Sequence, residues 1–159
     1  MRLVNLYVVN GGELDSDKYT YKLKWLDALI DWVKAERGRW EGPMVVCGDF
    51  NIAPGDLDVH DPKRWAGQVL CTDAERERLG RLKALGFHDS WRTLHPAERS
   101  FSWFDYRGAG FDRNEGLRID LHLVSGLPAR DPIDVVIDHD ARSRPESSDH
   151  APVTIFLGP

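Results

Sequence analysis

The first long stretch of alternating apolar and polar residues has helical spacing and predicts an amphipathic helix over residues 21–33. One face of that helix is apolar, which predicts that it packs on a core. Asp15, Ser16 and Asp17 offer a start signal, and Gly38 offers a stop. The residues that form the apolar face are Trp25, Leu26, Leu29, Ile30 and Val33.

A second helix is predicted after residue 72. The segment 72–75 reads Thr-Asp-Ala-Glu, which fits a capping box at the start of a helix. Leu79, Leu82 and Leu85 then give that helix an inner face, and Gly86 ends it.

The remaining apolar runs predict strands. Within residues 119–123 the alternation places Ile119, Leu121 and Leu123 on one face and Asp120 and His122 on the other. The order of strand, helix, strand, helix and then several strands predicts an α/β (α+β) sheet with helices on one side, in a single domain over residues 1–159. The predicted strands cover residues 2–9, 44–47, 100–104, 118–124, 133–137 and 153–157.

Composition narrows the class of protein only a little. The chain has 159 residues, enough for one buried core, and its 42% hydrophobic and 30% charged content excludes a disordered chain. A net charge of −5 argues against a protein that grips nucleic acid by charge alone. It leaves a nuclease open, because a divalent ion held by carboxylates brings positive charge to the cut site. Cys47 and Cys71 are expected to be reduced packing residues of a cytoplasmic protein, with a disulfide as the alternative.

Carboxylates, an amide and an imidazole stand at the ends of the predicted strands. Asp49, Asp120 and Asp149 have the oxygen ligands that Mg²⁺ prefers and the chemistry to activate a water molecule. Asn51 can orient that water or a phosphate oxygen through its amide. His150 can donate to a phosphate oxygen, with either Asp149 or Asp120 fixing its tautomer. These are the groups that a metal-assisted phosphodiester hydrolase requires.

Each group also has a plainer interpretation. Asp49 after a glycine is a common turn former, and the Asp-His pair at 149–150 can be a loop contact. Asp120 inside an apolar strand is less ordinary, because an unpaired buried carboxylate is costly and needs a partner. Trp103 taken alone is a core residue, and the histidines show no zinc spacing. Basic residues near these clusters that could contact DNA are Arg107, Arg113 and Arg118.

The clusters taken together resemble the endonuclease/exonuclease/phosphatase superfamily, and within it the bacterial exonuclease III branch. The resemblance covers essentially the whole chain and rests on four motifs in order. These are Gly-Asp-Phe-Asn-Ile-Ala-Pro at 48–54, Phe-Ser-Trp-Phe-Asp-Tyr-Arg at 101–107, Gly-Leu-Arg-Ile-Asp at 116–120 and Ser-Asp-His at 148–150.

The resemblance implies a DNase I-like sandwich and an enzyme that uses Mg²⁺ or Mn²⁺. Such an enzyme removes nucleotides from DNA 3′ ends, cuts beside abasic sites and trims 3′ blocking groups. By position, Asp49 would activate water, Asn51 would position it, and His150 would contact the phosphate with Asp120 or Asp149 beside it. Asp49, Asn51 and Asp149 are the implied metal residues.

The same resemblance implies residues that meet the DNA. Tyr7 matches an active-site tyrosine near the phosphate or leaving group, and Asn10 lies on the same loop. Trp103 would line a pocket for an abasic sugar with Leu117 beside it. Arg107 is the implied basic contact.

Two departures from the family pattern shape the expectations. Val9 stands where the family usually has proline, which predicts a looser loop around Tyr7 and Asn10. The pattern also begins partway along, after an early strand that carries an active-site Asn and a metal-binding Glu. We therefore expect a partial sandwich, weak metal affinity, and an apolar sheet face that a homodimer covers.

Three functions stay open on the sequence. The first is a metal-dependent DNA nuclease of 3′ exonuclease character. The second keeps the chemistry but acts on a phospholipid, an inositol phosphate or RNA. The third is a truncated relative that folds, and binds DNA or nothing, without cutting.

Overall fold

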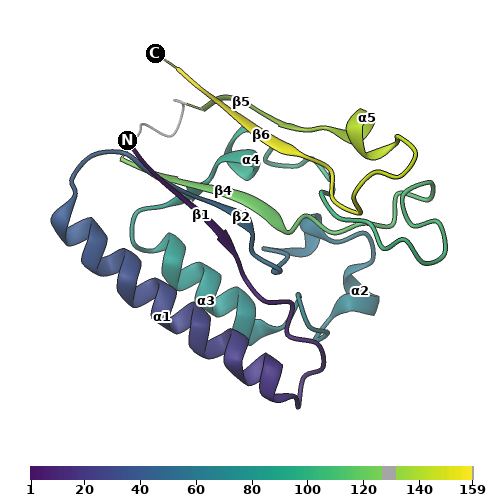
Figure 1. The fold of residues 1–159 in the computed structure, drawn as a ribbon, viewed down its shortest axis with the longest axis horizontal. Helices are drawn as coiled ribbons and strands as arrows, with labels where there is room; N and C mark the ends of the chain where they lie inside the picture. The colour runs from purple at the N-terminus through teal and green to yellow at the C-terminus, as the bar shows by residue number, and fades with distance from the viewer. Residues whose placement is uncertain (127–131, 159) are drawn as a thin grey trace.

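A computed structural model of the chain describes residues 1–126 and 132–158. Strands and helices alternate in the first half, and the second half is richer in strand and loop (Figure 1). The elements are β1 (Arg2–Tyr7), α1 (Asp17–Arg39), β2 (Met44–Asp49), a 3₁₀ turn η1 (Asp56–Asp58), α2 (Pro62–Trp65), α3 (Asp73–Lys83), β3 (His88–Asp89), α4 (Ser90–Leu94), β4 (Asp120–Ser125), β5 (Pro132–Ile137), α5 (His139–Arg142) and β6 (Val153–Leu157).

Four strands form a mixed sheet in the order β1-β2-β4-β3. β1 runs parallel to β2, whereas β4 runs antiparallel to β2 and to β3. The register places Tyr7 opposite Asp49 and Asp49 opposite Asp120. Three residues of the predicted site are thus neighbours at one end of the sheet.

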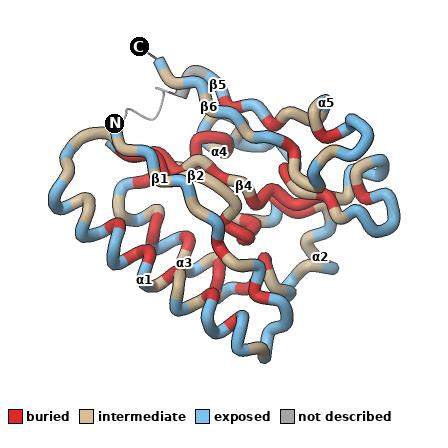
Figure 2. The backbone as a smooth tube through the Cα atoms, viewed as in Figure 1, coloured by how far each residue is buried: buried red, intermediate tan, exposed pale blue. Residues whose placement is uncertain are grey.

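The helices α1 and α3 cover one face of this sheet (Figure 1). The core between them is apolar and continuous, and Figure 2 shows it as red tube segments on the inner side of both helices. Val33, Met44, Val46 and Leu123 are fully buried there. This confirms the prediction that Ile119, Leu121 and Leu123 face a core while Asp120 and His122 point to the opposite face.

The strands β5 and β6 pair antiparallel as a separate two-stranded sheet. A small core beneath it joins Trp91 of α4 to Val135, Ile137 and Ala151. On the opposite face of the main sheet, Leu3 of β1 is 65% exposed, and in the two-stranded sheet Phe156 of β6 is 50% exposed. Within the described residues, no helix has the length and apolar character to cross a bilayer.

Most of the predicted elements are present, with shifted ends. Ser16 caps α1 by accepting a hydrogen bond from the backbone N–H of Tyr19, and the Thr72–Glu75 capping box is confirmed. The predicted stop at Gly38 is wrong by one residue, because α1 continues through Arg39.

The strand predicted over residues 100–104 is not formed. This segment is held instead by isolated bridges from Trp103 to Leu117 and to His150. Ser102, which has no exposed surface, accepts hydrogen bonds through its hydroxyl from the backbone N–H groups of Ile119 and Asp120, each at 3.1 Å. The Ser102 hydroxyl thus satisfies backbone N–H groups that a neighbouring strand would otherwise bond, and this explains why residues 100–104 stay irregular despite their apolar and aromatic composition.

Candidate active site

Asp49 is the last residue of β2 and follows a glycine. Gly48 has a φ of 125°, and a Cβ atom there would lie 2.0 Å from the carbonyl oxygen of Leu6 on β1. Only glycine fits such a close approach between two strands. The pairing of β1 with β2 therefore requires glycine at position 48, and this pairing places the Asp49 carboxylate at the end of the sheet.

Asn51 is tied to Asp49 at both of its carboxylate oxygens. The backbone N–H of Asn51 donates to Oδ1 of Asp49 at 2.8 Å, and its side-chain amide donates to Oδ2 at 2.7 Å. That amide also donates to the carbonyl of Val8 at 2.9 Å, and its oxygen accepts from the amide of Asn10 at 3.1 Å. Asn51 adopts a left-handed φ of 49°, a conformation that asparagine tolerates better than most residues. These bonds fix the amide beside the carboxylate.

His150 is bound to Asp120 across the site. Nδ1 of His150 lies 2.8 Å from Oδ2 of Asp120, so the ring presents Nε2 away from the carboxylate. The sequence left Asp120 and Asp149 open as partners of this ring, and the structure selects Asp120. The same contact answers why an ionisable residue stands in β4, because Asp120 has the partner that its half-buried carboxylate requires.

Charge is concentrated at this end of the sheet. Burial, with the nearby Asp120 charge, raises the pKa of Asp49 to about 6. Burial alone would lower the pKa of His150, but its hydrogen bond to Asp120 and the surrounding carboxylates together raise it. A carboxylate with a pKa near neutrality suits a proton acceptor, and a protonated imidazole suits a donor to phosphate.

Asp149 lies apart from the Asp49–Asn51 pair in its contacts. Its Oδ2 accepts a hydrogen bond from the indole Nε1 of Trp103 at 3.0 Å. Leu117 pairs with the backbone of Trp103 and is fully buried. We therefore revise the role of Leu117 from contact with a substrate to support of Trp103 from beneath.

A hollow of about 430 Å³ lies beside Trp103. Asn10, Trp65, Trp103 and Arg107 all line it, so three of the predicted substrate-binding residues gather around one space. The guanidinium of Arg107 is exposed and paired with Asp105, where an incoming phosphate can compete for it. Tyr7 lies at the end of β1 with 64% of its surface exposed, beside Asp49 in the register.

The three arginines proposed as DNA contacts have different surroundings. Arg113 forms an exposed pair with Glu115, as Arg107 does with Asp105. Arg118 is only 1% exposed and is bound to Asp58 and Asp89. The prediction that Arg118 contacts DNA is therefore wrong, because its guanidinium is buried and bound to two carboxylates.

Two residues near the site were not among the candidate site residues that the sequence predicts. Ser102 fixes the backbone at Asp120, as described above. Lys22 is buried on the inner face of α1 and donates to the carbonyl oxygen of Asn51 at 2.7 Å. The signal for Lys22 was present in the sequence, because this lysine stands one helical turn before Leu26 on the apolar face.

The donor chemistry fits a hydrated divalent cation. Asp49 and Asp120 are cross-strand neighbours, and their oxygens are of the kind that Mg²⁺ and Mn²⁺ accept. No three His, Cys, Asp or Glu side chains converge on one metal-sized position in residues 1–126 and 132–158. Such a site suits an ion that takes few ligands from protein and keeps waters or substrate oxygens.

The chain is similar in sequence to a family of known enzymes. The family model described as "Endonuclease/Exonuclease/phosphatase family" matches residues 21–150. Exodeoxyribonuclease III of Haemophilus influenzae is 38% identical over 161 aligned residues, which cover 96% of this chain and 60% of that protein.

Solved structures agree with this match. The 3′ phosphatase NExo from Neisseria, bound to a product DNA hairpin, superposes with a TM-score of 0.94 at 45% identity, covering 98% of this chain and 60% of that one. An AP endonuclease from Archaeoglobus fulgidus gives a TM-score of 0.90 at 33% identity, with the same coverage. The chain thus spans about 60% of the length of these relatives, and its fold is of the type that they share.

Proposed function

Because the chain belongs to the endonuclease/exonuclease/phosphatase family, we propose that it is a metal-dependent DNA phosphodiester hydrolase of DNA repair. The proposed activity is 3′→5′ exonucleolytic, with cutting at abasic sites and removal of 3′ phosphates. The observation that carries the proposal is the Asp120–His150 contact facing the Asp49–Asn51 pair at the end of one sheet. The similarity to relatives named as exodeoxyribonuclease, AP endonuclease and 3′ phosphatase supports the choice of DNA.

In this proposal the tasks of the reaction are divided among the side chains of the site. Asp49 takes the proton of the attacking water, and Asn51 holds that water or a phosphate oxygen in line. The water oxygen forms the new bond to phosphorus as the bond to the leaving oxygen breaks. His150, oriented by Asp120, donates to a non-bridging phosphate oxygen, and Tyr7 lies near the leaving group.

Mg²⁺ or Mn²⁺ is proposed as the cofactor. Of the metal residues that the sequence implies, Asp49 and Asn51 are in contact, and Asp49 with its cross-strand neighbour Asp120 would hold the ion, whereas the carboxylate of Asp149 accepts a hydrogen bond from Trp103. When bound, the ion would supply charge neutralisation at the phosphate. The proposal assigns the hollow beside Trp103 to the sugar next to the cut. Trp103 offers an aromatic face, Asn10 an amide and Arg107 a positive charge to the DNA backbone.

A substrate panel separates DNA from the other phosphodiesters that the same groups can attack. Duplex DNA with a recessed 3′ end, the same duplex with a 3′ phosphate or an abasic site, an RNA duplex and an inositol phosphate are incubated with the protein and Mn²⁺. We expect DNA to be cleaved at least about tenfold faster than RNA or inositol phosphate, because Trp103 and Arg107 serve a sugar–phosphate strand. Faster release from RNA or inositol phosphate would overturn the assignment of DNA.

We also propose that two copies of the chain form a homodimer through the face of the main sheet that the helices leave open. Leu3 exposes a large apolar surface on that face, and Phe156 exposes another on β6 of the separate two-stranded sheet. Among the described residues, β1 is an edge strand with one side unpaired. In a two-fold arrangement, the apolar surface of each copy would be covered by the same surface of the other copy.

A cytoplasmic location is proposed as well, since both cysteines are free thiols.

Sedimentation equilibrium tests the dimer. We expect a species of twice the 18.1 kDa chain mass, and its conversion to monomer by Leu3→Glu with Phe156→Glu. Tyr21→Glu on α1 is the matched control, because Tyr21 is 55% exposed on a different element. A wild-type chain that sediments as a monomer at micromolar concentration would contradict the proposal.

A further inference from the structure

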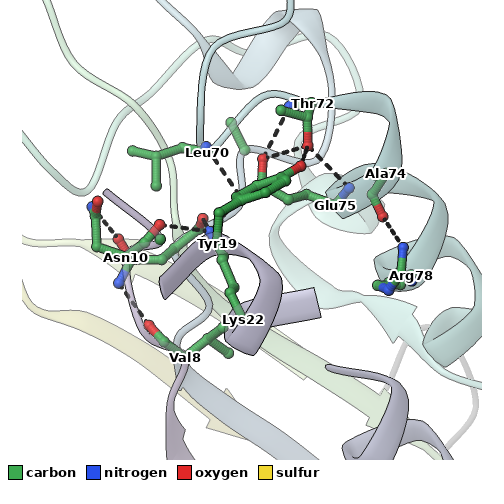
Figure 3. Close-up of polar contacts among 12 residues, drawn as sticks. Val8, Asn10, Tyr19, Lys22, Leu70, Thr72, Ala74, Glu75 and Arg78 are labelled. Carbon is green, nitrogen blue, oxygen red and sulfur yellow. Dashed lines mark hydrogen bonds and ion pairs between the residues drawn. The ribbon is translucent and has the colours of Figure 1, made fainter. Parts of the chain in front are cut away.

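A buried ion pair lies directly beneath the candidate active site. Lys22 of α1 and Glu75 of α3 are in contact, and neither side chain has any exposed surface. Figure 3 shows Lys22 reaching from its helix toward Asn10 on one side, with Glu75 and Thr72 on the other. The pair joins two helices to the loops that carry the site.

Every donor of Lys22 is used. Its Nζ donates to Glu75, to the carbonyl oxygen of Asn51 at 2.7 Å and to the carbonyl oxygen of Asn10 at 3.0 Å. An ammonium group has three N–H donors, so these contacts account for all of them. Two of the three hold the backbone of Asn10 and Asn51, whose side chains are hydrogen-bonded to each other, and the Asn51 amide in turn donates to Asp49.

Both carboxylate oxygens of Glu75 accept two hydrogen bonds each, which is more than the capping box alone requires. Its Oε2 accepts from the backbone N–H and the hydroxyl of Thr72, at 3.0 and 2.7 Å. Its Oε1 accepts from Lys22 and from the backbone N–H of Leu70 at 3.1 Å. Tyr19 adds a hydrogen bond of 2.6 Å to the Thr72 hydroxyl. The carboxylate that receives Lys22 is thus fixed from both sides.

Burial of this pair is not explained by stability alone. Removing two charges from water is costly, and well-packed apolar residues often stabilise a core as well as a buried ion pair does. The two carbonyl contacts of Lys22 have a geometric effect that apolar residues cannot supply. They join the loop at Asn10 to the turn at Asn51, where the backbone is in the left-handed region.

We propose that Lys22 is a positioning residue for the active site and that Glu75 fixes it there. Lys22 meets neither substrate nor reacting atoms. It acts through the backbone of Asn10 and Asn51, and so sets where the Asn51 amide lies relative to the Asp49 carboxylate. The proposal deepens the nuclease function given above and rests on it for its kinetic consequence, whereas its geometric consequence is independent of activity.

The test compares Lys22→Met with the double variant Lys22→Met/Glu75→Gln. The single variant leaves the Glu75 carboxylate buried without its cation and is expected to lower the urea midpoint. The double variant removes both charges, and the introduced glutamine retains a side-chain oxygen for the cap at Thr72. It is expected to recover most of the midpoint. Lys24→Met, on the exposed face of the same helix, is the matched control.

Two readouts separate positioning from mere support of the fold. In ¹H–¹⁵N spectra of the double variant, we expect the side-chain amide of Asn51 to shift and to exchange with solvent at least about tenfold faster, because its backbone anchor is gone. With DNA, we expect kcat to fall at least about tenfold while KM stays within about twofold. Lys22→Arg, which keeps a cation and several N–H donors, is expected to restore both readouts in part.

A double variant with wild-type stability, a wild-type Asn51 amide and wild-type kcat would overturn the positioning role. A double variant that loses stability but keeps the Asn51 amide signal in its folded fraction would overturn it as well. Should wild-type protein cleave no DNA, the nuclease proposal fails, and the Asn51 resonances still decide whether Lys22 positions that side chain.

Discussion

Replacing His150 by alanine is expected to lower kcat/KM for DNA hydrolysis by about 10²- to 10⁴-fold, the range that a positioned proton donor or acceptor contributes. Nδ1 of the imidazole is held 2.8 Å from Asp120. Burial opposes a charged ring, but the hydrogen bond to Asp120 and the surrounding carboxylates raise the pKa of His150, which favours the protonated form that donates to the phosphate. Alanine removes the donor, and the Asp120 side chain keeps access to water as an alternative partner, so we expect the fold to persist. Initial rates on a 5′-labelled duplex measure the loss.

A second substitution shows whether the two residues act together. Asp120→Asn keeps the volume of the side chain and removes the charge that orients the ring, and we expect a comparable loss. The two changes combined should cost little more than either alone, because groups that act as a unit are not additive. His95→Gln, at the end of α4, serves as a control for the loss of a histidine. Additive losses, or a His150→Ala rate within about threefold of wild type, would exclude the proposed pair.

Replacing Arg118 by methionine is expected to lower the free energy of unfolding by about 3–5 kcal/mol at pH 7. Arg118 donates through Nε to Asp58 at 2.7 Å and through both terminal nitrogens to Asp89 at 3.0 and 2.6 Å. Methionine fills the space but leaves two carboxylates buried without this cation. Urea denaturation followed by tryptophan fluorescence measures the change.

The loss should depend on pH in a definite direction. Burial raises the pKa of Asp89, but the charge of Arg118 and its hydrogen bonds outweigh burial and lower it. A lowered folded pKa means that the pair stabilises the protein above the unfolded value of about 3.9 and that this stability disappears as the pH falls. The difference between wild type and Arg118→Met should therefore shrink toward pH 3.

The surface pair of Arg113 with Glu115 gives the comparison. Arg113→Met removes a similar guanidinium–carboxylate contact on the surface, where water screens the two charges, and we expect no measurable change in the urea midpoint. Equal effects of the two substitutions, or a loss at Arg118 that does not vary with pH, would show that the buried network contributes nothing beyond side-chain packing.

The sequence was sufficient to predict the elements that carry the site. Alternation in residues 119–123 separated the core residues from Asp120 and His122, and the short apolar run before Gly48 predicted a strand that delivers Asp49. Each of these patterns is local, because it depends on which face of one strand is buried. Once β2 pairs with β4, Asp49 and Asp120 lie opposite each other in the sheet.

Features that depend on distant contacts were harder to predict. Residues 100–104 have the composition of a strand, but the hydroxyl of Ser102 satisfies the backbone of β4 where a strand partner would. Arg118 and Leu117 stand within a motif that suggests DNA contact, whereas both are buried. Lys22 finds its partners 12 to 53 residues along the chain, and no spacing within α1 reveals them.

The most direct test of the account is the digestion of a 5′-labelled DNA duplex by the purified chain in Mg²⁺, Mn²⁺ or EDTA, beside an Asp120→Ala variant made identically. We expect a ladder that shortens from the 3′ end, requires the divalent ion and is absent with Asp120→Ala. Wild-type protein and variant that leave the duplex equally intact, or degrade it equally, would contradict the claim that these residues form a working nuclease site.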